Sequence, residues 1–209
     1  MDKYFSLQKL ILSISLNSSS GIFSSTRELP FVLEIIKGLE TTREDKYFSL
    51  LLFKDLYQFF NSEEKDILFV KIKNKYIKQR QNLDIHLSKT LLNFLLNYGV
   101  RKLSVGETDL IKEQFELYKV GLKDNLLIYN DRITDNTFSN VIICGAYLKE
   151  YEWTEKFINN YGFFLSDASR ADIIAFNKAN LNFKQQRFQK TLEILNNTHF
   201  KKLLYLVNA

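Results

Sequence analysis

Hydrophobic residues recur along this chain with the spacing of amphipathic helices. Residues 1–16 place their apolar side chains on one helical face, and residues 31–39 continue with the same periodicity. Residues 44–60 are dense in Phe, Leu and Tyr on nearly every side, which is typical of a helix packed between neighbours. Sustained alternation of apolar and polar residues, the mark of a half-buried strand, is missing from the sequence. The pattern therefore predicts helices and no sheet.

Polar and conformationally special residues predict where several helices begin and end. The run 17–21 predicts a loop, and Pro30 suits the start of the helix over 31–39. Ser62 and the acidic residues after it predict the start of a helix that continues to about Arg80. The chain is thus expected to be all-α, with about 8–11 helices.

Two further boundaries are predicted in the middle of the chain. Residues 83–98 are expected to form a helix that ends at Gly99, because glycine favours the position just after a helix. Ser104 and Glu107 then have the spacing of a capping box, which predicts that the next helix begins there.

The C-terminal part of the chain repeats a pattern of large and small apolar residues. Each copy has a small residue, Cys144 or Ala179, that lets two helices cross closely, and a polar turn follows. The matched positions lie thirty-five residues apart: Val141, Cys144, Leu148, Trp153 and Phe157 correspond to Phe176, Ala179, Phe183, Phe188 and Leu192, and the turn 149–152 corresponds to 184–187. This spacing is close to the tetratricopeptide unit of about 34 residues.

Several stretches of this region also carry a family resemblance. They are residues 115–119, 138–142, 149–158 and 176–179, with Tyr161, Arg170 and Phe183. Through them, residues 92–209 resemble an uncharacterised family of bacterial tetratricopeptide-like proteins. The resemblance implies a right-handed α-α superhelix, or α-solenoid, and no known activity.

These patterns divide the chain into three parts. Residues 1–28 are expected to form an N-terminal helix and a Ser-rich loop, residues 29–130 a region of degenerate helical hairpins, and residues 131–209 two tetratricopeptide-like hairpins with a partial terminal helix. That last helix is either a cap or the start of a further pair that the family continues. Its apolar side chains predict an exposed edge through which a homodimer forms: Leu203, Leu204, Leu206 and Val207.

Composition narrows the class of protein further. The 209 residues are 45% hydrophobic, contain one Pro and one Cys, and carry a formal net charge of +5. An internal disulfide is impossible, and no apolar run is long enough to span a bilayer. Asp2 and the interrupting serines disfavour a signal peptide at the N-terminus. A cytoplasmic protein is expected, with no membrane partner.

Side chains that could carry catalysis are sparse. The histidines are His86 and His199, and His86 is interpreted as a core or boundary residue in an apolar helix. Cys144 fills the small position of the repeat, so packing explains it. The sequence has no zinc spacing, calcium loop or glycine-rich phosphate loop, and Glu150, Glu152 and Glu155 are interpreted as a solvated edge. No catalytic residue, metal site or cofactor is predicted, so the protein is expected not to be an enzyme.

A basic segment offers the first candidate binding surface. Residues 70–80 contain five basic residues and no acid, and Lys71, Lys75 and Lys78 fall on one helical stripe. A solvated helix face explains this pattern, and contact with an acidic protein or a phosphate backbone is the sharper alternative. Only Tyr76 interrupts the stripe, which disfavours base stacking.

The concave face of the two C-terminal hairpins offers the second candidate surface. It is predicted to hold side chains that bind a peptide carboxylate or an extended backbone: Gly145, Lys149, Asn180 and Lys184. The carboxylate clamp of tetratricopeptide domains places a lysine one turn before an asparagine. Phe176 and Val141 occupy the corresponding positions, so C-terminal chaperone peptides are not the predicted ligand.

Taken together, these features predict a non-enzymatic helical-repeat scaffold that binds a protein or peptide. Two alternatives stay open. One is a basic, nucleic-acid-associated helical protein that uses residues 71–80. The other is a truncated fragment of a longer tetratricopeptide-like protein.

Overall fold

The computed structural model describes residues 2–19, 31–40, 47–198 and 200. Within these residues the fold is all-helical, with ten α-helices, two 3₁₀ helices and an isolated bridge between Tyr129 and Arg132. This confirms the all-α prediction and the expected number of helices. The helices are α1 (Lys3–Ser19), α2 (Val32–Glu40), α3 (Phe48–Phe60), α4 (Lys65–Gln79), η2 (Arg80–Asn82), α5 (Ile85–Ser104), α6 (Ile111–Lys123), α7 (Asp135–Tyr147), α8 (Tyr151–Tyr161), η3 (Gly162–Phe164), α9 (Arg170–Lys184) and α10 (Phe188–Asn196).

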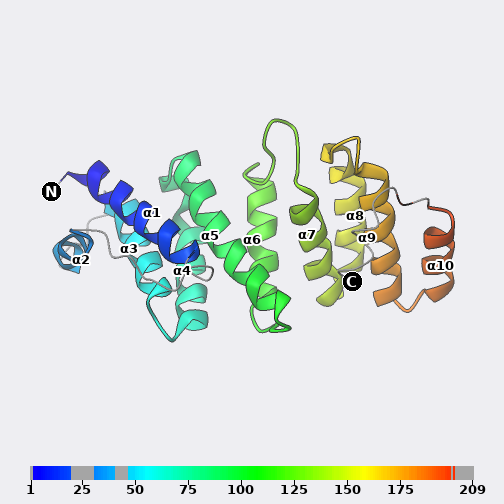
Figure 1. The fold of residues 1–209 in the computed structure, drawn as a ribbon, viewed down its shortest axis with the longest axis horizontal. Helices are drawn as coiled ribbons and strands as arrows, with labels where there is room; N and C mark the ends of the chain where they lie inside the picture. The colour runs from blue at the N-terminus through cyan, green and yellow to red at the C-terminus, as the bar shows by residue number, and fades with distance from the viewer. Residues whose placement is uncertain (1, 20–30, 41–46, 199, 201–209) are drawn as a thin grey trace. The chain divides into compact units, whose positions relative to one another are not determined.

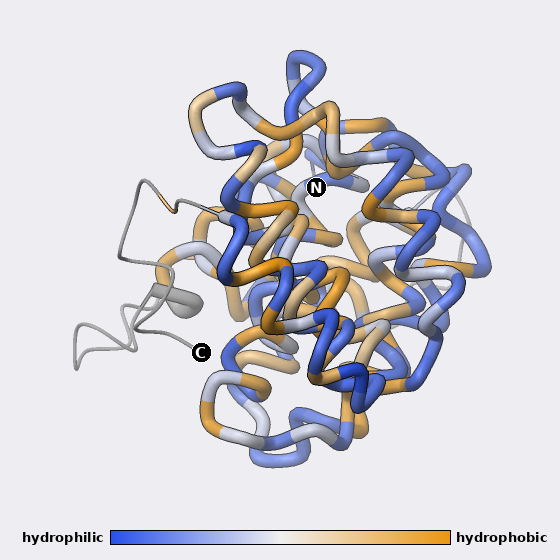
Figure 2. The backbone as a smooth tube through the Cα atoms, turned by 90° about the vertical axis from the view of Figure 1, so that its right-hand side faces the viewer, coloured by the Kyte–Doolittle hydropathy of each residue, from blue (hydrophilic) through white to orange (hydrophobic). Residues whose placement is uncertain are grey.

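The chain forms two compact units, Met1–Tyr98 (unit 1) and Gly99–Ala209 (unit 2). Helix α5 continues from one unit into the other. Hydrophobic and hydrophilic stretches follow one another closely along the backbone, as the colouring in Figure 2 shows. Each helix therefore has an apolar side that a neighbour in its own unit can cover.

Unit 1 is built around α3, which packs against α1, α2 and α4. Leu10 and Ile14 of α1 are fully buried, as are Phe53 and Leu56 of α3. Helix α1 continues three residues past its predicted end at residue 16. Its N-terminus is capped by Asp2, whose carboxylate accepts a hydrogen bond of 2.9 Å from the backbone N–H of Tyr4.

A second group of contacts in unit 1 is an aromatic cluster centred on Tyr98 of α5. The Phe59 and Phe69 rings lie 4.8 and 5.6 Å from the Tyr98 ring. The Tyr98 hydroxyl donates a 2.7 Å hydrogen bond to the Asp66 carboxylate in the first turn of α4. Two ring contacts and one hydrogen bond thus join α5 to α3 and α4.

Unit 2 contains two consecutive antiparallel hairpins, α7–α8 and α9–α10, as Figure 1 shows. Helix α7 packs against α6, α8 and α9, so it lies at the centre of the unit. Its buried side chains include Phe138, Val141, Ile142 and Cys144. Thr134 caps its N-terminus by accepting a 3.1 Å hydrogen bond from the backbone N–H of Thr137.

The end of α5 differs from the prediction in the middle of the chain. The helix does not stop at Gly99 but continues to Ser104, and Gly106 takes the left-handed conformation after it (φ 82°). The N–H groups of Gly106 and Glu107 bond to the carbonyls of Leu103 and Lys102, which is a Schellman ending. Ser104 and Glu107 therefore close a helix instead of opening one. The next helix, α6, begins at Ile111.

The first helix of each hairpin ends in the same way, but without glycine. Lys149 follows α7 with φ 59°, and Gln186 follows α9 with φ 61°. In both turns the next residue, Glu150 or Arg187, donates its N–H to the carbonyl five positions earlier, at 2.8 and 2.9 Å. Asn125 after α6 has the same left-handed conformation (φ 55°).

These turns set the register of the two hairpins around the turn; at the outer ends, where the first helices begin and the second helices end, the displacement is 35 positions. The first helices end at residues 147 and 184 and the second helices begin at residues 151 and 188, a displacement of 37 positions in each case. The predicted alignment of thirty-five positions is therefore wrong around the turn. Thr154 and Thr191 are equivalent in the register around the turn, because each donates its hydroxyl to the N-cap carbonyl, Glu150 or Arg187.

Several predicted features lie outside the described residues. They are Pro30, His199 and the proposed apolar edge formed by Leu203, Leu204, Leu206 and Val207.

Candidate functional site

The predicted lysine stripe is present on α4 in unit 1. Lys71, Lys75 and Lys78 are exposed, while Ile72 and Tyr76 between them are fully buried. Amphipathic spacing thus separates the two faces of the helix as expected.

The positive charge of this segment is nevertheless smaller on the surface than in the sequence. Lys75 forms an ion pair with Asp55 of α3. Lys73 is buried, and the Arg80 guanidinium donates a 2.7 Å hydrogen bond to the carbonyl of Ile77. Asp55 therefore offsets the charge of Lys75, whereas the half-buried Arg80 keeps its charge, because a carbonyl is neutral.

Of the residues predicted to share a concave face in unit 2, three are accessible and one is buried. Gly145 is buried where α7 meets α8, so its inclusion in a binding face was wrong. Lys149 and Lys184 are exposed near one end of the hairpins, where the Tyr151 hydroxyl donates 3.2 Å to the Lys184 carbonyl. Asn180 is half-buried one turn before Lys184. None of these four lines either of the two grooves described below.

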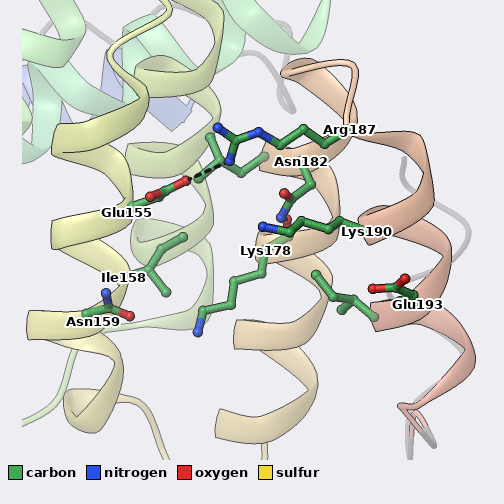
Figure 3. A pocket seen from close by; sticks show the side chains of 10 residues that line it. Glu155, Ile158, Asn159, Lys178, Asn182, Arg187, Lys190 and Glu193 are labelled. Atoms are coloured by element: carbon green, nitrogen blue, oxygen red, sulfur yellow. Dashed lines mark hydrogen bonds and ion pairs between the residues drawn. The ribbon is translucent and has the colours of Figure 1, made fainter.

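A groove lies between the second helices α8 and α10, with α9 behind it (Figure 3). Its volume is about 420 Å³. Lys178 and Lys190 extend from α9 and α10 towards α8, as Figure 3 shows. The α8–α10 groove is lined by Glu155, Ile158 and Asn159 of α8, by Lys178, Leu181 and Asn182 of α9, and by Arg187, Lys190, Glu193 and Ile194.

Polar contacts hold one end of this groove in place. The Arg187 guanidinium lies 3.6 Å from the Glu155 carboxylate, and Gln185 donates a 3.3 Å hydrogen bond to the same carboxylate. The side-chain amide of Asn182 donates a 2.8 Å hydrogen bond to the Lys178 carbonyl, and its oxygen can still accept a hydrogen bond. The helical period puts Asn180 and Lys184 on the opposite side of α9.

A second groove lies on the other side of α8, against α6. Its volume is about 360 Å³. The α6–α8 groove is lined by Lys119, Leu122 and Lys123 of α6 and by Trp153, Lys156, Phe157, Asn160 and Tyr161 of α8. All its charged lining side chains are lysines, whereas the α8–α10 groove mixes both signs.

An aromatic ladder forms the α8 wall of the α6–α8 groove. The Trp153 and Phe157 rings are parallel, with an interplanar angle of 4° and centroids 5.7 Å apart, and Tyr161 stacks on Phe157 at 5.1 Å. The Lys119 ammonium lies over the rings of Phe115 and Trp153, at 4.2 and 5.1 Å from their centroids. Such cation–π contacts hold the charge of Lys119 at the edge of the groove.

The titratable side chains named as catalytic candidates differ in how deeply they are buried. Cys144 is fully buried, and burial raises the pKa of its thiol to about 12. Burial, and then the charge of Cys144, also raises the pKa of Tyr118 well above its ordinary value. A thiol with so high a pKa is a poor nucleophile, which agrees with a packing role. His86 is exposed near the start of α5, so its interpretation as a core or boundary histidine was wrong.

The described residues hold neither a cluster of metal ligands nor a membrane-spanning helix. Among the described residues, no group of three or more His, Cys, Asp and Glu side chains is close enough to hold a metal ion. Within those residues, too, no helix combines the length and the apolar character that crossing a membrane would require.

The groove residues were missed at the level of sequence, although part of their pattern was visible. Trp153, Phe157 and Tyr161 recur every four residues, and Lys119 and Lys123 have the same spacing, so each set lies along one helical face. Which helix faces which could not be read from that spacing. Comparison with known proteins found no match to any protein-family model, any curated protein or any solved structure.

Proposed function

We propose that the protein is a non-enzymatic helical-repeat scaffold that holds an extended segment of a partner protein in the α8–α10 groove. The observation that carries this proposal is the groove itself, about 420 Å³ in volume and bounded by three helices. Grooves between repeated helices are common sites for peptide recognition.

The lining of the groove suits a peptide in particular. Ile158, Leu181 and Ile194 provide apolar contacts for ligand side chains. Asn159 and Asn182 offer amide groups that can bond to a peptide backbone, whatever its sequence. Because acidic and basic side chains both line the groove, the ligand need not carry a large net charge.

The repeat architecture is part of the same proposal. We take the hairpins α7–α8 and α9–α10 as tetratricopeptide-like units of a right-handed superhelix, in a protein that acts in the cytoplasm. Their shared turn geometry and their similar spacing, 35 positions at the outer ends of the hairpins and 37 at the turns, support this reading. A hairpin of this kind cannot bury its apolar faces alone, so stacking of successive units is expected.

A peptide array probed with the full chain tests the proposal. We expect a subset of peptides with spaced apolar residues to bind, and the double substitution Asn159→Ala and Asn182→Ala to weaken that binding about tenfold, because two backbone contacts are lost. The matched control is the double substitution Gln189→Ala and Asn136→Ala, at two residues that are exposed outside the groove. Equal effects of the two double substitutions would show that the groove is not the binding site.

The second candidate function is association with nucleic acid through α4. It is favoured by the exposure of Lys71, Lys75 and Lys78 on one side of that helix. Binding of this kind weakens steeply with salt, because contacts to phosphates release counterions. A gel shift unaffected by replacing all three lysines with alanine would reject it. A pull-down from cell extract, with and without nuclease, then separates the two functions.

A further inference from the structure

The α6–α8 groove combines apolar walls with a concentration of positive charge. Lys119 and Lys123 lie one turn apart on α6, and Lys156 faces them from α8. The rest of the lining is Leu122, Asn160 and the ladder of Trp153, Phe157 and Tyr161. Converging cations repel one another, and an anionic ligand between them removes that repulsion.

The positions of the lysines are suited to carboxylates at the rim. Lys119 is held over the Phe115 and Trp153 rings, so less side-chain freedom is lost when it binds a ligand. Lys123 and Lys156 are exposed, and both can turn towards a ligand in the groove. Charged contacts are therefore available on both helices.

We propose that the α6–α8 groove binds an acidic segment of a partner protein, with an apolar side chain of that segment against Trp153 and Tyr161. Flanking carboxylates bond to Lys119 and Lys123 on one side and to Lys156 on the other. The class of ligand rests on the peptide-binding function proposed above. The surface is different, since Trp153, Lys123 and Lys156 do not line the α8–α10 groove.

Two features of the groove favour a peptide over other anions. An inorganic anion would leave the wall formed by Leu122, Trp153 and Tyr161 without a partner, and that wall is the larger part of the lining. A nucleic-acid strand is best held by cations that follow its backbone along a face. Here the lysines converge from two helices on one short groove.

Trp153 is the chain's single tryptophan, so its fluorescence reports on this groove directly. The experiment titrates the full chain with a peptide in which one leucine is flanked on both sides by glutamates. We expect a saturable change in Trp153 emission, and binding at least about tenfold weaker for the same peptide with glutamines, since the charged contacts are lost.

A matched pair of variants locates the site. Lys123→Ala with Lys156→Ala is expected to weaken binding about tenfold. Lys37→Ala with Lys112→Ala makes the same change in charge on exposed residues outside the groove, and its affinity is expected to stay within about twofold. All four lysines are exposed, so both variants should fold.

Three results would overturn the proposal. They are equal binding of the glutamate and glutamine peptides, equal losses in the two double variants, and tighter binding of oligothymidylate with the same dependence on Lys123 and Lys156. The last would make this a nucleic-acid site. The Asn159 and Asn182 variants leave this groove intact, so failure here and failure of the α8–α10 groove are distinguishable.

Discussion

The hydroxyl of Thr154 on α8 occupies the space beside Gly145 of α7 in which any other residue would place its Cβ atom. A Cβ added to Gly145 would lie 2.2 Å from Thr154 Oγ1. The hydroxyl is held there by its 2.7 Å hydrogen bond to the Glu150 carbonyl. The next atoms, in the Phe115 ring, are 3.3 and 3.4 Å away. The close crossing of α7 and α8 therefore depends on a glycine facing a threonine.

This contact predicts that Gly145→Ala lowers the free energy of unfolding by about 2 kcal/mol, because the clash outweighs the gain in helix propensity. Thr154→Ala alone should cost about 1 kcal/mol through the lost hydrogen bond. The double variant should cost less than the sum of the two, since removing the hydroxyl opens the space that the new methyl needs. Urea unfolding of the four proteins measures this coupling.

Gly162→Ala is the control for the Gly145 substitution. There the added Cβ would meet the Cδ1 atom of Ile174 at 2.8 Å, which is the end of a flexible side chain. A smaller loss of stability is expected than at Gly145. If Gly162→Ala costs as much, or if the double variant is additive, the Gly145–Thr154 contact does not limit the crossing.

The left-handed turn residues predict a stabilising change. Gln186 has φ 61°, a conformation that costs a residue with a Cβ atom about 1 kcal/mol relative to glycine. Gln186→Gly should therefore raise the free energy of unfolding by up to about 1 kcal/mol. The measurement is the shift of the urea midpoint at constant slope.

The neighbouring position supplies the control for this change. Gln185 has φ −82°, where glycine gains nothing from its freedom and loses chain entropy. Gln185→Gly is expected to be neutral or destabilising. Stabilisation by both substitutions would mean that the gain does not come from the left-handed conformation of residue 186.

The helices themselves could be predicted because apolar periodicity is a local property of the sequence. Their ends were harder to predict. Both Gly99 and Gly106 suit the C-terminus of α5, and only packing decides between them: a Cβ on Gly99 would lie 2.7 Å from the Gln114 side chain, so close packing explains a glycine inside the helix. Sequence signals for caps do not contain that tertiary contact.

The predicted alignment of the two hairpins was wrong around the turn for a related reason. The residues with left-handed conformation in the two turns are Lys149 and Gln186, and neither is a residue type that marks such a position. Matching Lys149 to Lys184 was the natural alignment by residue type, and it is two positions out. The candidate grooves could not be predicted, because they form only where α8 lies between α6 and α10. The order of the helices along the chain does not show that arrangement.

The buried thiol predicts a loss of stability at high pH. The pKa of Cys144 is raised to about 12 by burial, above its ordinary value, so the folded protein keeps the proton over a range in which the unfolded chain has lost it. The stability from this group is complete below the ordinary pKa and falls as the pH rises from about 9 towards 12, by about 1.4 kcal/mol per pH unit. Chemical unfolding at a series of pH values measures the slope.

Cys144→Ala separates the thiol from other groups that titrate in this range. Tyr118, whose pKa is also raised, contributes above about pH 10. Between pH 9 and 10 the variant should therefore show a flatter slope than the original protein. Identical slopes in that window would indicate that Cys144 reaches solvent in the folded state, as would rapid reaction of the native thiol with a disulfide reagent.

The hydrogen bond between Tyr98 and Asp66 predicts that the stability of unit 1 depends on the Tyr98 hydroxyl. Tyr98→Phe keeps the ring contacts with Phe59 and Phe69 and removes only the 2.7 Å hydrogen bond. Because the acceptor is a carboxylate, the loss should be about 1.5–3 kcal/mol, more than a neutral hydrogen bond contributes. The exposed Tyr4→Phe is the control and should change stability by less than about 0.5 kcal/mol. Equal and small effects would mean that water replaces the hydroxyl at Asp66 without cost, and that the aromatic contacts alone hold α5 against α3 and α4.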